Sequence, residues 1–89
     1  MKNIEIIEKD VTKVKLTINP NRITIKYPLG FNDKTKRNKI ENFILNEIDN
    51  KIKVLNKTYR GTFDEFGITL MNDNKQDKIR FEYENNRNS

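Results

Sequence analysis

The stretch VTKVKLTINPNRITIKY, Val11 to Tyr27, decides the fold, because apolar and polar residues alternate on both sides of an Asn-Pro-Asn turn. Pairing Ile18 with Ile23 across a four-residue loop, Asn19 to Arg22, gives a β-hairpin with one apolar face. That face comprises Val14, Leu16, Ile18, Ile23, Ile25 and Tyr27. A slip of one residue would place half of these side chains in solvent, so the pattern predicts the register as well as the strands.

The apolar period then changes to steps of three and four residues, which predicts one amphipathic helix over about residues 34–55. Its apolar stripe comprises Ile40, Phe43, Ile44, Ile48, Ile52 and Leu55. The spacing of Asn38 and Glu41 fits a capping box, and Asn32 or Asp33 offers an earlier helix start. Asn56 fits the C-terminal stop.

Period-two alternation returns after the helix and predicts three further strands, around Tyr59–Phe63, Ile68–Leu70 and Ile79–Tyr83. Ile4 and Ile6 indicate a short extra strand before a turn at Glu8–Asp10. The sequence therefore predicts an α+β fold. We expect an antiparallel sheet, made of an N-terminal β-hairpin and a C-terminal three-stranded meander, with one long helix packed on one face. Residues 1–84 would form a single domain and 85–89 a frayed tail.

Composition argues against several classes of function. The 89 residues include no Cys and no His, and the only Ser is the last residue, so the usual general base, thiolate nucleophile and Ser-based triad are missing. Asp64 and Glu65 fall in one turn and Asp73 and Asp77 in another, and the loop of Asp73 and Asp77 lacks the spacing of a calcium loop. We therefore expect no enzymatic activity, no cofactor and no metal. With no apolar run near the roughly 20 residues of a membrane span, we expect a cytoplasmic protein without a membrane partner.

Charge is concentrated where the strand parity points away from the predicted core. The net charge is only +5, but parity places many cations together on the polar side of the sheet. These cations are Lys13, Lys15, Lys26, Arg60, Lys78 and Arg80, with Arg22 at the hairpin tip. Lys15 and Lys26 should be direct cross-strand neighbours, an arrangement of like charges that is destabilising by itself. The inward parity of Tyr27, Tyr59, Phe63, Phe81 and Tyr83 leaves none of these rings on that face to stack on bases.

A second group of cations precedes the helix, in the stretch GFNDKTKRNK, Gly30 to Lys39. Its members include Lys34, Lys36 and Arg37. A helix start normally favours acids, because its free N–H groups carry partial positive charge. Cations there, together with those N–H groups, could hold a phosphate. An ordinary solvated surface is the alternative for both basic groups.

Together these features favour a small, basic, non-catalytic protein that contacts nucleic acid, most simply the duplex backbone, through phosphates. An acidic protein surface is the other partner that fits. The abundance of Asn, Ile and Lys is typical of AT-rich genes. It suggests as the alternative function a phage or mobile-element accessory protein that binds and inhibits a host enzyme of defence or nucleic-acid handling.

Overall fold

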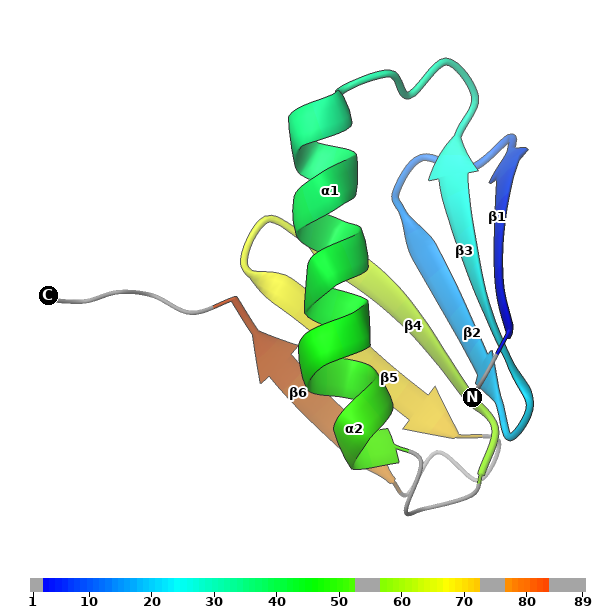
Figure 1. The fold of residues 1–89 in the computed structure, drawn as a ribbon, viewed down its shortest axis with the longest axis vertical. Coiled ribbons are helices and arrows are strands. Elements are labelled where there is room, and N and C mark those ends of the chain that lie inside the picture. Colours follow the sequence, from blue (N-terminus) through cyan, green and yellow to red (C-terminus); the bar gives the residue numbers. More distant parts are fainter. Residues whose placement is uncertain (1–2, 53–56, 73–76, 84–89) are drawn as a thin grey trace, which may run out of the picture.

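The computed structural model describes residues 3–52, 57–72 and 77–83. It is an α+β structure in which one helix covers one side of a six-stranded mixed sheet (Figure 1). The strands are β1 (Asn3–Lys9), β2 (Lys15–Asn19), β3 (Arg22–Pro28), β4 (Tyr59–Asp64), β5 (Gly67–Asn72) and β6 (Lys78–Glu82). Their order across the sheet is β1-β3-β2-β4-β5-β6.

The hairpin of β2 and β3 has the register that the alternation predicts. Ile18 pairs with Ile23, and Lys15 pairs with Lys26. The predicted four-residue loop is two residues shorter, because Asn19 and Arg22 also pair and leave only Pro20 and Asn21 as the turn. All six apolar residues of the hairpin face are buried.

The prediction of a fully antiparallel sheet is wrong at β1. This strand covers the predicted Ile4–Ile6 segment but runs parallel to β3, while the other neighbouring strands pair antiparallel. The reason lies in the direction of β2, to which both β1 and β3 run antiparallel, and in the edges that the hairpin offers. The chain returns from the helix to pair β4 with β2, so the remaining free edge of the hairpin is that of β3, and β1 occupies it.

The helix consists of α1 (Lys34–Phe43), a π-helical turn η1 (Ile44–Ile48) and α2 (Asp49–Ile52). It begins at the earlier of the two predicted starts, since Asp33 Oδ1 accepts a hydrogen bond from Lys36 N at 3.1 Å. The predicted capping box is wrong, because Asn38 lies inside α1 and Glu41 accepts a hydrogen bond from Tyr27 Oη at 2.9 Å. The predicted helix end at Leu55 and Asn56, and the predicted tail at 85–89, lie outside the described residues.

The wide turn η1 keeps the apolar stripe aimed at the sheet. Ile40, Ile44, Ile48 and Ile52 are spaced by four, and each such step drifts by about 40° around an α-helix of 3.6 residues per turn. A π turn closes its hydrogen bond one residue later, as the bond from Asp49 N to Ile44 O shows. The wider turn offsets the drift of the step from Ile44 to Ile48, and all four isoleucines are buried.

The stripe provides a test of the packing. We expect Ile48→Asp to unfold the domain, because Ile48 is fully buried and an unpaired buried charge costs several kcal/mol, comparable with the roughly 5–15 kcal/mol of a whole small domain. Circular dichroism with urea titration measures the loss. Asn42→Asp places the same charge on the exposed side of the helix and should change stability by less than about 0.5 kcal/mol. Equal stability of the two variants would contradict this packing.

Candidate nucleic-acid interface

The side of the sheet away from the helix, here called the open face, carries two rows of side chains that cross all six strands. The strand registers place Ile7, Lys26, Lys15, Thr62, Thr69 and Arg80 in one row, from β1 to β6. The second row reads Glu5, Thr24, Thr17, Arg60, Met71 and Lys78. The predicted cations Lys15, Lys26, Arg60, Lys78 and Arg80 therefore do share one surface.

The part of the open face that β2 and β3 form carries cations and no acid. As far as the described strands extend, β2 and β3 present only Lys, Arg, Thr, Asn and Pro there. Glu5 lies on β1, where it accepts a hydrogen bond from Thr24 Oγ1 at 3.3 Å and lies 3.9 Å from Arg22 Nη1. Glu5 belongs to β1, and the sequence pattern did not predict which strand β1 pairs with. The position of Glu5 beside Arg22 therefore could not be predicted from the sequence.

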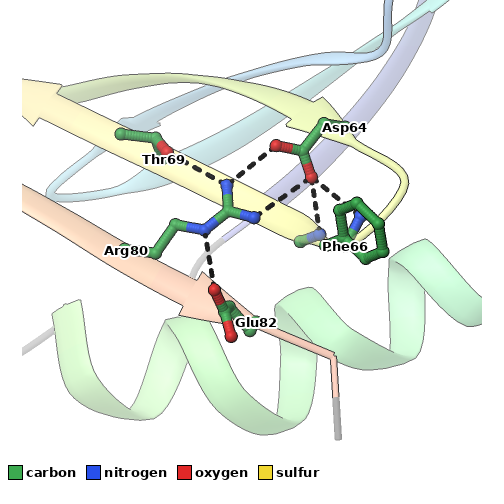
Figure 2. A network of polar contacts seen from close by, with 6 residues as sticks. Asp64, Phe66, Thr69, Arg80 and Glu82 are labelled. Carbon is green, nitrogen blue, oxygen red and sulfur yellow. Dashed lines mark hydrogen bonds and ion pairs between the residues drawn. The ribbon is translucent and has the colours of Figure 1, made fainter. Parts of the chain in front are cut away.

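Arg80 is held by acids of its own chain (Figure 2). Its guanidinium donates to both carboxylate oxygens of Asp64, at 3.0 and 3.2 Å, and to Thr69 Oγ1 at 3.1 Å. Nε lies 3.5 Å from Glu82 Oε2. Alternation places Arg80 on the correct face, but these contacts turn its donors toward β4 and β5 instead of toward a ligand.

Asp64 also closes the turn between β4 and β5. Its Oδ1 accepts hydrogen bonds from Phe66 N at 2.8 Å and from Gly67 N at 2.9 Å. Gly67 has a φ of +154°, and a Cβ there would clash with the carbonyl oxygen of Phe81, so glycine is required where β5 meets β6. The hydrogen bonds from Arg80, and then those from the turn amides, lower the pKa of Asp64 to about 2.

Arg37, from the group of cations before the helix, is likewise engaged within the protein. Its guanidinium lies 4.2 Å from the ring centroid of Tyr27 and donates through Nη2 to the carbonyl oxygen of Phe31 at 2.9 Å. The same nitrogen forms an ion pair with Glu8 of β1 at 3.0 Å. Arg37 therefore ties the start of the helix to β1 and to the β3–α1 loop.

Lys34, Lys36 and Lys13 remain exposed. Lys13, just before β2, and Lys36 line a pocket of about 530 Å³ between the helix start and the sheet, together with Lys39. Phe31, Phe63 and Tyr83 form part of its apolar lining. The structure thus places some of the predicted site residues on the open face and others on the helix side of the sheet. Lys13 lies just before the start of β2, between the two groups.

Within the described part of the chain, no cluster of three or more Asp or Glu side chains is placed to hold a metal ion. No helix among those residues is long and apolar enough to cross a membrane. Comparisons with protein-family models, with curated proteins and with solved structures find no match to this chain. A functional proposal therefore has to come from the surface itself.

The Asp64–Arg80 contact predicts a pH dependence. A carboxyl whose pKa falls on folding contributes stability that is present above its unfolded pKa, near 3.8, and is lost as the pH falls toward about 2. We expect Asp64→Asn to lower the urea midpoint most at pH 6, with the difference from the parent shrinking between pH 4 and pH 2. Glu65→Gln, in the same exposed turn, is the control for loss of charge alone. A constant difference over the whole pH range would contradict the ion pair.

Proposed function

We propose that this protein is a small non-catalytic binding protein that holds the phosphate backbone of a nucleic-acid duplex on the open face. The observation that carries the proposal is the pairing of Lys15 with Lys26, directly opposite each other on β2 and β3 of that face. Like charges so placed oppose folding unless an anion lies between them. Within the residues that the structure describes, neither side chain has an ion pair, so the compensating charge would come from the ligand.

The neighbouring side chains suit phosphate. Thr62 is paired with Lys15, and Thr17 lies two residues further along β2. Their hydroxyls donate to phosphate oxygens as lysines do. The four buried rings of the sheet are Tyr27, Tyr59, Phe63 and Phe81, all on the helix side. A surface of lysine and threonine without rings recognises the backbone and not the bases, so binding should be independent of sequence.

A second candidate is a protein partner, namely a host enzyme that this chain would inhibit. Leu29 and Phe66 favour it, because 63% and 64% of their surfaces are exposed. They follow β3 and precede β5, and they lie at the same end of the sheet because β3 and β4 both run antiparallel to β2. The basic pocket between helix and sheet opens near that end, lined by Pro28 and Glu65 among others. Exposed apolar side chains beside cations suit an acidic protein surface.

Charge reversal on the open face tests the first candidate. We expect Lys15→Glu/Lys26→Glu to lose about tenfold or more of the affinity for a duplex, measured by fluorescence anisotropy at low salt. The parent's log–log salt slope should be about −0.9 per phosphate contact, and the variant's slope should be shallower by about two contacts. Two duplexes of unrelated sequence should bind the parent equally well.

The matched control is Lys34→Glu/Lys36→Glu, which changes the net charge by the same amount on exposed residues of the first helical turn. It should keep most of the affinity. Equal losses in both double variants would show that net charge, and not the open face, determines binding. A parent that binds neither DNA nor RNA duplexes at low salt would exclude the nucleic-acid proposal and leave the protein partner.

A further inference from the structure

Strand β1 is an edge strand whose apolar side chains are left uncovered. None of its seven residues is buried, and Ile4 and Ile6, which point to the helix side, are 39% and 45% exposed. At the opposite edge, β6 has its Phe81 buried in the core. Figure 1 shows the helix crossing the other part of the sheet and β1 lying at the far edge. Uncovered edge strands with exposed apolar residues are ready to pair with another strand.

The direction of the free backbone groups follows from two hydrogen bonds. Asn3 N donates to Asn21 O at 3.2 Å, and Lys9 O accepts from Leu29 N at 3.1 Å. Both groups point toward β3, and backbone groups alternate along a strand, so Glu5 and Ile7 also point toward β3. The N–H and C=O groups of Ile4, Ile6 and Glu8 therefore point away from the sheet. Among the described strands, β1 pairs only with β3.

We propose that β1 pairs antiparallel with β1 of a second copy of this chain, with Ile6 opposite Ile6 on the twofold axis. This register also places Ile4 opposite Glu8 of the other copy. Each of the three pairs consists of outward-pointing residues, which gives about six backbone hydrogen bonds. Moving the second strand by two residues in either direction leaves two such pairs, and therefore about four backbone hydrogen bonds. One of those shifts also places Glu5 directly opposite Glu5, which is destabilising.

Side-chain chemistry agrees with a second copy as the occupant. The two Ile6 side chains cover each other on the helix side, where each is exposed in the single chain. Lys9 lies diagonally across from Glu5 of the other copy, within reach for a long side chain. Glu8, which would face Ile4, is already neutralised by Arg37 at 3.0 Å. The interface is therefore self-complementary in backbone, apolar contact and charge, as a twofold dimer requires.

The dimer does not depend on what the open face binds, but it affects that face. An antiparallel pairing within one continuous sheet turns both helices to the same side, so both open faces lie together on the other side. Across the sheet, Lys26 of the two copies would be three strand spacings apart, or roughly 14 Å at about 4.8 Å per strand, with an offset of two residues along the strands. A dimer would thus present two basic centres to one ligand.

Cysteine cross-linking tests the register, since the chain has no Cys of its own. A hydrogen-bonded antiparallel pair has a Cα–Cα distance of about 5.5 Å, inside the range of about 4.4–6.8 Å that a disulfide spans. We expect Ile6→Cys to form a covalent dimer under mild oxidation. Ile4→Cys is the matched control on the same face. Residue 4 of the second copy would lie four residues along the strand from residue 4 of the first, so this variant should cross-link at least tenfold more slowly.

Analytical ultracentrifugation adds a test without cysteine. The parent should form a dimer at micromolar to millimolar concentration, and Ile6→Pro should be monomeric with the fold of the parent, because that N–H points outward and its loss breaks no bond to β3. A parent that stays monomeric throughout would overturn the proposal. Equal cross-linking of Ile4→Cys and Ile6→Cys, or a dimer that survives Ile6→Pro, would overturn it as well.

Discussion

Burial of a six-stranded sheet under a single helix is the constraint on which the other features depend. A helix with its side chains is about 10–12 Å wide, whereas six strands at about 4.8 Å spacing span roughly 24 Å. The helix therefore cannot cover every strand, and the remaining width has to be filled by other means. Tyr27, Phe31 and Arg37 extend the cover toward β3 through stacked rings and a cation over an aromatic face. At β1 this cover reaches only Glu8, through its ion pair with Arg37, so the isoleucines of the strand stay exposed.

The arginines and lysines divide the electrostatic tasks in a way that fits their chemistry. Arg37 and Arg80 use the planar fork of the guanidinium to bridge segments that are distant in sequence, through several acceptors each. Lysine carries a compact, strongly hydrated charge on a flexible stem and suits an exposed position. Lys15 on the open face is exposed, and Lys26 opposite it is half-buried. The cations that could meet a ligand and the cations that hold the fold are thus largely different residues.

Among the described residues, alternation and helical period predicted most of the side chains that enter the core, because burial depends mainly on each residue's own position; Ile79 and Tyr83 are only partly buried. They predicted the hairpin register and placed Lys15 opposite Lys26 for the same reason. They could not predict the parallel pairing of β1, since Ile4 and Ile6 would alternate equally well beside either edge. Nor could they separate Arg80 from Lys78. The two share a face and a strand, and the turn at Asp64 brings its carboxylate to Arg80.

The lack of buried residues in β1 has a consequence for the order of events in folding. Release of this strand from β3 would uncover little apolar surface of its own, so it can open at a lower free energy than the rest of the sheet. β1 also precedes β3 in the chain, so synthesis completes it before the edge that it pairs with exists. The hairpin, helix and remaining strands can close the core without it. β1 is therefore suited to join last, and its amides should exchange with solvent while those of β2 and β4 remain protected.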